Sequence, residues 1–518
     1  MAEIGIPYQR SLMSTWGALE PEPGKWVWEN LDAQWQYLHD RGIETGTLLL
    51  GKPTWDQSDP PGYLPVHNLD GWSRYVGKTV THLRGKTRRF EVWNEPPNFT
   101  GADQTPTDYA RIVVAAYDAA KKANPDCLVG LTAKSAHIQY LEEVIRAGAA
   151  DHFDWVSLHP YEILDGIATN SGMEPVYLHI VPTLRKMLAS ANPGKKEVPI
   201  HFTELGVDAV RHGPEAQAKA LIKAYAMGIA QGVENIQWFE GRDGDSGPMG
   251  LLDGEGNPRR AWHAYRHLIQ ALGPHPKSIG RMLLGNSTYA FAFEGHHGPV
   301  LIAWTPRVTA TEQVFPAPVK ITNALSGEAI TADRATISDT PLFITGIPRE
   351  WLKKAASWEG ESLPWPGAEP AVDLKEAFIE FGDRPIEKGL HTRAAGDVSG
   401  AVVAYGGPAR AGDIPGGNLF VVDPDFLSYD QVPITITAEV RRKEKVTNAG
   451  FKLVYESTAG FRTAGDWYTI PDAEGWHTVR WQIDDPCFVN YWGYNFRLES
   501  DGNTYNQYYI RRISVEKR

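Results

Sequence analysis

The stretch Arg89-Phe-Glu-Val-Trp-Asn-Glu-Pro-Pro97 begins like a buried strand and stops abruptly at two prolines. Proline lacks a backbone N–H and fixes its φ angle, so Pro96 and Pro97 cannot continue a strand and force the chain into a loop. Just before this stop the chain places Asn94 and Glu95. The pattern predicts a strand whose end carries an amide and a carboxylate.

This predicted strand belongs to a repeating pattern. Up to about residue 272, short apolar runs typical of buried strands alternate with amphipathic stretches typical of helices, which predicts a parallel sheet covered by helices. Seven such runs favour an α/β fold of the closed (β/α)8 TIM-barrel type, and no glycine-rich nucleotide-binding loop follows any of them. The predicted strands are 8–14, 44–50, 89–93, 127–131, 155–158, 200–203 and 235–239, and the predicted helices are 31–41, 108–123, 140–147, 215–231 and 261–271.

A second run, His201-Phe-Thr-Glu-Leu-Gly206, has the same form and ends on Glu204. Functional side chains of such barrels sit at the carboxyl ends of the strands. Glu95 and Glu204 lie three strand–helix units apart, so we expect them to face each other across the barrel mouth. Two facing carboxylates suit glycosidic bond cleavage, because one protonates the leaving oxygen while the other attacks the anomeric carbon or activates water. The alternative is that Glu95 and Glu204 each form a structural salt bridge and have no catalytic role.

The composition limits the function classes. A chain of 518 residues is too long for one core, and 22% charged with 42% hydrophobic residues is typical of a globular protein. The net charge of −12 argues against nucleic acid as a partner. The 18 Trp residues favour a carbohydrate-active protein, because sugar rings stack on flat aromatic faces. Cys127 and Cys487 are too few and too distant for a disulfide framework.

The chain contains no run of about 18 apolar residues, so we expect no membrane span. Its first residues, Met1-Ala-Glu-Ile-Gly5, lack the basic start and apolar core of a signal peptide. The localisation therefore stays open, with secretion or a periplasmic location expected if a signal peptide was removed. The expected partner is a carbohydrate substrate, without nucleic acid or membrane, and an oligomer is compatible with the sequence.

The motifs around the two carboxylates resemble those of the clan A glycoside hydrolases, which are retaining (β/α)8 enzymes. Val92-Trp-Asn-Glu-Pro96 resembles the clan's signature around the acid/base, which implies that role for Glu95. Thr203-Glu-Leu-Gly206 resembles its nucleophile strand, which implies that role for Glu204. The likeness covers about residues 3–345 and fits family 39 and its relatives best.

This resemblance implies cleavage of β-glycosidic bonds in a poly- or oligosaccharide by double displacement, with no metal and no other cofactor. Two alternatives stay open. One is an α-L-arabinofuranosidase of a neighbouring clan A family, which would use the same two carboxylates. The other is a non-catalytic carbohydrate-binding protein on a hydrolase barrel.

The resemblance also implies substrate-binding residues, each with a plain structural alternative in a turn or in the core. Asn94 resembles the residue that hydrogen-bonds the sugar 2-hydroxyl, and Arg10 resembles an arginine near the nucleophile. His159 and Tyr161, in Ser157-Leu-His-Pro-Tyr161, resemble the histidine and tyrosine of the sixth strand. Trp238 resembles the floor of the −1 subsite. The remaining candidates are Trp16, which precedes the family-like stretch Glu20-Pro-Glu-Pro-Gly-Lys-Trp26, and Trp55.

Two further expectations concern the catalytic pair. Retention requires the carboxyl groups of Glu95 and Glu204 to lie about 5–5.5 Å apart. Burial and the neighbouring carboxylate should raise the pKa of Glu95, so that it is protonated when it acts as an acid. His263 and His267, four residues apart on the last predicted helix, have a metal-compatible spacing, but solvated or packed histidines are favoured.

The family motifs imply that the strand at 8–14 is the second of the barrel, so the first is missing. We expect the position between this strand and the strand at 235–239 to be filled. The filler would be a later segment such as 350–370 or a partner molecule, unless the natural protein has residues before Met1. An unfilled barrel would leave two strand edges unpaired.

The sequence predicts four regions. A catalytic barrel over 1–275 is followed by a small β-sandwich over 276–350, a linker or strap over 351–370, and a jelly-roll over 371–518 that resembles carbohydrate-binding modules. The motif residues all precede residue 245, so the last module is expected to be separable from the catalytic chemistry. Trp467, Tyr491 and Trp492 are candidates for a sugar-stacking platform or for its core.

Overall fold

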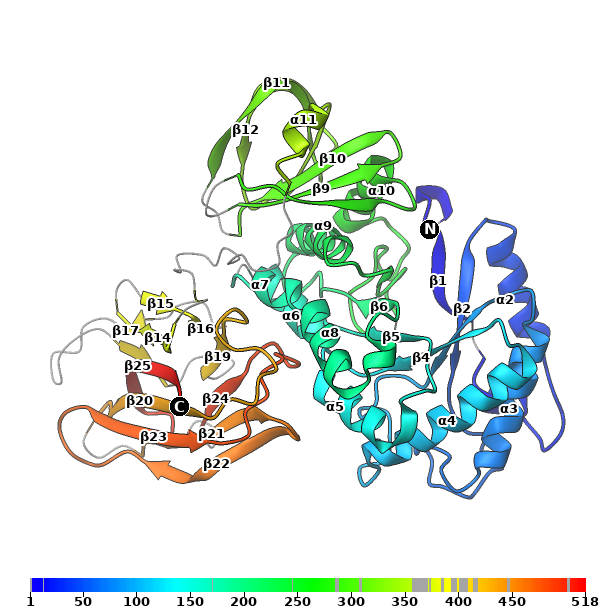
Figure 1. Cartoon of the computed structure of the whole chain (residues 1–518), viewed down its shortest axis with the longest axis horizontal. Helices are drawn as coiled ribbons and strands as arrows, with labels where there is room; N and C mark the ends of the chain where they lie inside the picture. Colours follow the sequence, from blue (N-terminus) through cyan, green and yellow to red (C-terminus); the bar gives the residue numbers. More distant parts are fainter. Residues whose placement is uncertain are drawn as a thin grey trace.

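The computed structural model describes residues 2–12, 14–169, 171–244, 246–284, 288–306, 310–355, 371, 374–382, 386–392, 398–399, 409–412, 418–444, 448–500 and 504–518. Figure 1 shows a parallel barrel, a small antiparallel sheet that follows it, and a β-rich C-terminal module. None of the described helices is both long enough and apolar enough to cross a membrane.

The barrel contains seven parallel strands in sequence order from β1 to β7, which confirms all seven predicted strands. The five inner strands form near-continuous buried runs, as expected when helices cover a parallel sheet, whereas the two outer strands are only partly buried. The strands are β1 (Tyr8–Leu12), β2 (Glu44–Leu49), β3 (Arg89–Val92), β4 (Leu128–Thr132), β5 (Trp155–Leu158), β6 (Ile200–Leu205) and β7 (Asn235–Trp238).

Helices follow most of the strands and pack on the outside of the sheet (Figure 1). The five predicted helices are present, whereas the helices at Leu69–His82, Tyr161–Ala168, Glu174–Leu178 and Ile180–Ala191 were not among the predictions. The main helices are α2 (Glu29–His39), α3 (Leu69–His82), α4 (Pro106–Ala123), α5 (Ile138–Val144), α6 (Tyr161–Ala168), α7 (Glu174–Leu178), α8 (Ile180–Ala191), α9 (Pro214–Ala230) and α10 (Arg260–Leu272).

The barrel wall is open between β1 and β7. Among the described strands, β1 pairs with β2 alone and β7 with β6 alone. A cavity of about 1060 Å³ runs along both free edges, lined by Tyr8 and Arg10 from β1 and by Ile236 and Trp238 from β7. The expectation that a later segment fills this position is wrong for the described residues.

The strap proposed as the filler is described only in part. Its short helix α11 (Arg349–Leu352) packs on the small antiparallel sheet through Leu352 and Trp351 rather than on the barrel edges. Residues 356–370 lie outside the described residues.

The six described strands of the region after the barrel form one hydrogen-bonded antiparallel sheet. Its order is β12-β11-β13-β10-β9-β8. Alternate residues of a strand point to opposite faces, so Phe291 and Trp304 pack on the barrel while Ala292 and Leu301 face the sheet's own apolar cluster. The strands are β8 (Lys277–Arg281), β9 (Tyr289–Gly295), β10 (Gly298–Trp304), β11 (Thr311–Asn323), β12 (Ala329–Ile337) and β13 (Leu342–Thr345).

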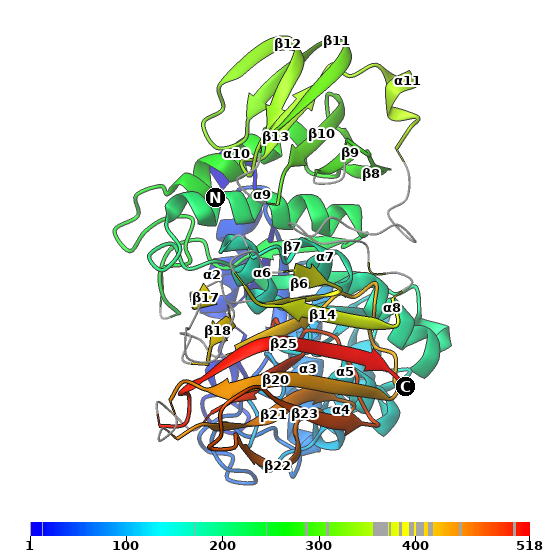
Figure 2. The ribbon, with the colours of Figure 1, turned by 90° about the vertical axis from the view of Figure 1, so that its left-hand side faces the viewer.

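The C-terminal module contains two antiparallel sheets around a separate apolar core. Figure 2 shows β14 (Glu376–Glu380), β25 (Tyr508–Lys517), β20 (Ile434–Arg442) and β23 (His477–Ile483) side by side in the first sheet. The second sheet has the order β16-β19-β24-β21-β22, with β16 (Leu390–Thr392), β19 (Asn418–Val422), β24 (Phe496–Glu499), β21 (Gly450–Ser457) and β22 (Gly460–Thr469).

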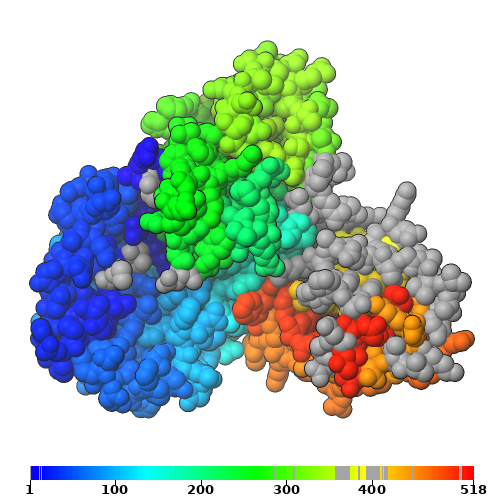
Figure 3. All heavy atoms as spheres, turned by 180° about the vertical axis from the view of Figure 1, so that it is seen from behind, coloured from blue at the N-terminus to red at the C-terminus, as the bar shows by residue number. Residues whose placement is uncertain are grey.

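The module lies directly against the barrel (Figure 3). The large apolar cluster of the barrel continues into residues of the module, so the two bodies share a buried contact. The module residues in this cluster are Val421, Tyr429, Cys487, Val489, Tyr491 and Tyr494.

Candidate active site

The end of β3 places Glu95 through an unusual turn. Trp93 and Glu95 adopt φ angles of 67° and 47°. These values lie in the left-handed region of backbone conformation, which residues other than glycine rarely adopt. The turn is held by the Trp93 indole N–H, which donates to the Phe99 carbonyl at 2.5 Å, and by the Tyr109 hydroxyl, which donates to the Val92 carbonyl at 2.7 Å. Strain of this kind is typical of functional sites.

Glu204, on β6, accepts hydrogen bonds at both carboxylate oxygens. The Arg10 guanidinium donates to Oε1, and the Tyr161 hydroxyl donates to Oε2 at 2.9 Å. Burial and the Glu204 carboxylate raise the pKa of Tyr161 well above its usual value, so its hydroxyl stays protonated and remains a donor. The Glu204 side chain therefore lies between a cation on one side and a hydroxyl on the other.

Arg10 also binds Glu91 and Asn94, and Glu91 was not among the predicted site residues. The Arg10 Nε donates to Glu91 at 2.7 Å, and the Arg10 Nη2 donates to the Asn94 side-chain oxygen at 2.9 Å. Burial opposes ionisation of Glu91, but the Arg10 charge outweighs it and lowers the pKa of Glu91 to about 2. The signal in the sequence was a charged residue inside the apolar run of a buried strand.

Glu95 is paired with His159, which is completely buried at the end of β5. The His159 Nδ1 lies 2.7 Å from the Glu95 Oε1. Burial opposes ionisation of Glu95, but the hydrogen bond and the charge of His159, together with Arg10 and Asn98, lower its pKa below the usual value. The expectation of a raised pKa for Glu95 is therefore wrong, because it considered burial and the second carboxylate but not the histidine.

The two carboxylates lie close together. Glu95, His159 and Glu204 each offer one ligand atom within 4.8 Å of the others, which makes this trio the one group in the described part of the chain with a spacing suited to a metal ion. The Arg10 guanidinium is bonded to Glu204, and its charge already compensates that carboxylate. We therefore do not assign the trio as metal ligands. Carboxylates at this spacing can act on one bond, one as nucleophile and one as acid.

The predicted tryptophans have different positions. Trp238 ends β7 and lines the cavity beside Glu204, with its indole N–H donating to the Met249 carbonyl at 3.0 Å. Trp16 is 0% exposed and stacks on Tyr75, so its predicted contact with substrate is wrong; motif similarity did not reveal its burial. Trp55 is half-buried against Trp16, and its role in binding stays a prediction.

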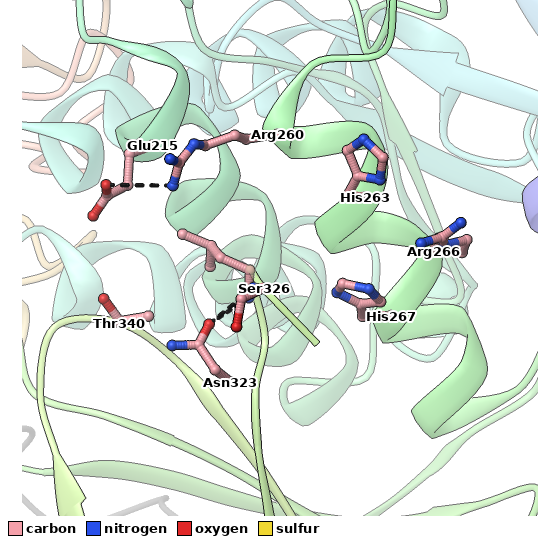
Figure 4. A pocket seen from close by; sticks show the side chains of 9 residues that line it. Glu215, Arg260, His263, Arg266, His267, Asn323, Ser326 and Thr340 are labelled. Carbon is pink, nitrogen blue, oxygen red and sulfur yellow. Dashed lines mark hydrogen bonds and ion pairs between the residues drawn. The ribbon is translucent and has the colours of Figure 1, made fainter. Parts of the chain in front are cut away.

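His263 and His267 lie away from this site. Both line a separate cavity of about 390 Å³ between α10 and the small sheet, together with Arg260, Arg266 and Glu215 (Figure 4). The His267 Nδ1 contacts the Ala324 carbonyl at 3.0 Å. Within the described residues, no third ligand joins the two histidines in a group suited to a metal ion.

No family model matches the sequence, and no curated protein matches it. Among solved structures, a family 39 glycoside hydrolase from the gut symbiont Bacteroides cellulosilyticus is 20% identical, with a TM-score of 0.57 over 66% of this chain and 76% of that one. A GH30 endoxylanase from Clostridium papyrosolvens is 14% identical, with a TM-score of 0.47 over 67% of this chain and 90% of that one. The first likeness shows the fold: this chain has the (β/α)-barrel architecture found in that family 39 glycoside hydrolase.

Proposed function

We propose that the protein is a retaining glycoside hydrolase that cleaves β-glycosidic bonds of a poly- or oligosaccharide by double displacement. The observation that carries this proposal is the pair Glu95 and Glu204, on strand ends across the barrel mouth, with oxygens within 4.8 Å of each other. Retaining enzymes hold their carboxyl groups about 5–5.5 Å apart, whereas inverting enzymes need about 6.5–9.5 Å to admit a water.

Glu204 is the nucleophile in this proposal. Arg10 and Tyr161 each donate to one of its oxygens, which supports an ionised carboxylate in a fixed orientation. Attack on the anomeric carbon would form a glycosyl ester as the bond to the leaving oxygen breaks. Water, activated by Glu95, would then hydrolyse that ester and regenerate Glu204.

Glu95 is the acid and then the base, and its hydrogen bonds suggest where the first proton is held. The Thr203 hydroxyl donates to ionised Glu91 at 3.0 Å, so its oxygen must accept from the His159 Nε2–H, which lies 3.0 Å away. With Nε2 protonated, the contact of 2.7 Å between the His159 Nδ1 and Glu95 needs one further proton. The pair therefore shares that proton.

A shared proton reconciles the lowered pKa of Glu95 with its role as an acid. When the proton is on His159, Glu95 is ionised and the two form an ion pair. When the leaving oxygen develops negative charge, the proton can pass through Glu95 to that oxygen. The pair would then be regenerated when Glu95 takes a proton from the attacking water.

The test is turnover of a panel of aryl glycosides and polysaccharides, with the anomer of the first product followed by ¹H NMR. The proposal expects a β-linked substrate and a β product before mutarotation. An α product from a β substrate would show inversion and overturn the mechanism. The panel includes aryl α-L-arabinofuranosides, because exclusive activity on these would support the arabinofuranosidase alternative. The same assay is also run with a metal chelator present, and the turnover rate is expected to be unchanged.

A further inference from the structure

A loop of the C-terminal module packs onto the barrel beside the active site. This loop, 486–494, joins β23 to β24. The ring of Tyr491 stacks on His137 with centroids 4.0 Å apart, and the Gln139 side-chain amide donates to the Cys487 carbonyl at 2.8 Å. Both barrel residues lie in or next to the connection between β4 and α5, at the rim of the barrel mouth.

The loop is held rigidly from within the module. The buried carboxylate of Glu456, on β21, accepts the backbone N–H groups of Val489, Asn490 and Tyr491 at 2.8–3.0 Å. The Asn495 side-chain amide donates to it at 2.8 Å. Burial raises the pKa of Glu456 to about 7, and the four hydrogen bonds oppose that shift. The same four bonds fix the position of the residues that face the barrel.

The next residue of this loop, Trp492, leads to the proposed acid/base. The Lys134 ammonium lies 4.6 Å from the centre of the Trp492 ring, within the range of a cation–π contact. The same ammonium donates to the Asn98 Oδ1 at 2.8 Å. The Asn98 backbone N–H donates to the Glu95 carbonyl at 2.7 Å, and the Asn98 side chain lies close enough to the Glu95 carboxylate to help lower its pKa.

The donor and acceptor groups of Lys134 and Asn98 determine which end of the Asn98 amide faces each neighbour. Lysine is a donor only, so the Asn98 oxygen must face Lys134. The Asn98 NH₂ is then the end of the amide that faces Glu95. Without the ammonium, the Asn98 amide could turn when Glu95 is protonated and accept the Glu95 O–H with its oxygen, which would favour the protonated form.

We propose that Lys134 and Trp492 are positioning residues for Glu95, through which the C-terminal module completes the active site. Lys134 orients the Asn98 amide, and Trp492 holds the Lys134 ammonium in place. This inference rests on the proposed function of Glu95. It runs against the sequence-based expectation that the module is separable from the catalytic chemistry.

The effect on proton binding has a definite sign. An amide N–H that faces Glu95, and a cation beyond it, both favour the ionised carboxylate and lower its pKa. Loss of Lys134 should therefore raise the pKa of Glu95. The other titratable groups that face these two residues are not substituted in the variants proposed below. Around Glu95 they are Arg10, His159, Tyr161 and Glu204, and around Lys134 they are His137 and Glu162.

The experiment compares the wild type with Lys134→Met, Lys134→Arg and Trp492→Ala in the full chain. The pKa of Glu95 is measured by ¹³C NMR of protein labelled at the glutamate carboxyl carbons, with Glu95→Gln used to assign the signal. The alkaline limb of kcat/KM is measured on an alkyl glycoside. Lys186→Met is the matched control, because Lys186 binds Asp430 across the same interface, on α8 rather than at the mouth.

Lys134→Met should raise the pKa of Glu95 by about half a unit to one unit. The alkaline limb of kcat/KM, which reports loss of the proton shared by Glu95 and His159, should move in the same direction. Trp492→Ala should act in the same direction by less, while Lys134→Arg and Lys186→Met should stay near the wild type. A Glu95 pKa unchanged in both Lys134→Met and Trp492→Ala, or shifted equally by Lys186→Met, would overturn the inference. The NMR titration gives this answer even if no glycoside is turned over, an outcome that would count against the proposed function alone.

Discussion

The two sides of the barrel differ in how their strands are connected. From β3 to β6, parallel pairing is continuous and buried polar side chains bond across the interior: Glu91 on β3 binds Arg10, Ser157 and Thr203. Between β7 and β1, no described strand joins the edges and a cavity runs along them. The candidate site is therefore held by cross-strand hydrogen bonds on the closed side, with Arg10 reaching into it from the open edge.

This difference separates two kinds of residue. On the closed side, one change should remove a charge or a proton that the chemistry needs, or leave a buried partner unpaired. On the open side, a truncation that removes the same number of atoms should lower the free energy of unfolding by less, because the side chains there already border the cavity. The four predictions that follow test this contrast.

The largest effect is expected for Glu204→Ala. Removing the nucleophile should lower kcat/KM by at least about 10⁴-fold on every substrate, which corresponds to about 5 kcal/mol of transition-state stabilisation. The measurement is initial rate on aryl and alkyl glycosides, with circular dichroism to check folding. Activity within about tenfold of the wild type would assign the nucleophile to another residue.

Glu95→Ala should have a large but selective effect. Loss of a general acid costs about 10²–10⁴-fold where the leaving group needs a proton, and far less where it does not. Dinitrophenyl glycosides should therefore retain much of their turnover, while alkyl glycosides lose nearly all. Equal losses on the two substrates would contradict the assigned roles, and Glu204→Ala, which should lose both, is the matched comparison.

How far the sequence predicted this site depends on the range of the interactions. The strands and the proximity of Glu95 to Glu204 followed from periodicity and two local motifs, because strand ends of a barrel converge. Glu91 was missed because its partners lie on three other strands, and the direction of the Glu95 pKa was missed because it depends on His159. Trp16 was misplaced because its motif carries no information about burial. The catalytic roles of the two glutamates stay predictions.

Glu91→Gln should change how stability depends on pH. The pKa of Glu91 falls from 4.5 to about 2 on folding, so its contribution is present above about pH 4.5 and is lost as the pH falls through about 2. This contribution amounts to about 3 kcal/mol. The free energy of unfolding by urea should therefore fall less between about pH 5 and about pH 2 in the variant than in the wild type.

A control for this pH effect is Glu22→Gln, which removes an exposed carboxylate paired with Lys25. Exposed pairs contribute little to stability, so its curve should follow that of the wild type. If Glu91→Gln also follows the wild type across this range, the Arg10–Glu91 pair does not carry the acid sensitivity of the barrel.

The smallest effect compares two isoleucines on neighbouring strands. Ile200 on β6 is 0% exposed, whereas Ile236 on β7 is half-buried and lines the open cavity. Truncating a fully buried isoleucine costs about 2–5 kcal/mol, because it removes apolar contacts and leaves a void. Ile236→Ala should cost about 1 kcal/mol, because the space it vacates joins an existing cavity and only part of its surface was buried. The measurement is the urea midpoint and slope of each variant against the wild type. Equal destabilisation of the two would mean that the β7 edge is covered in solution, and the contrast between the two sides of the barrel would then fail.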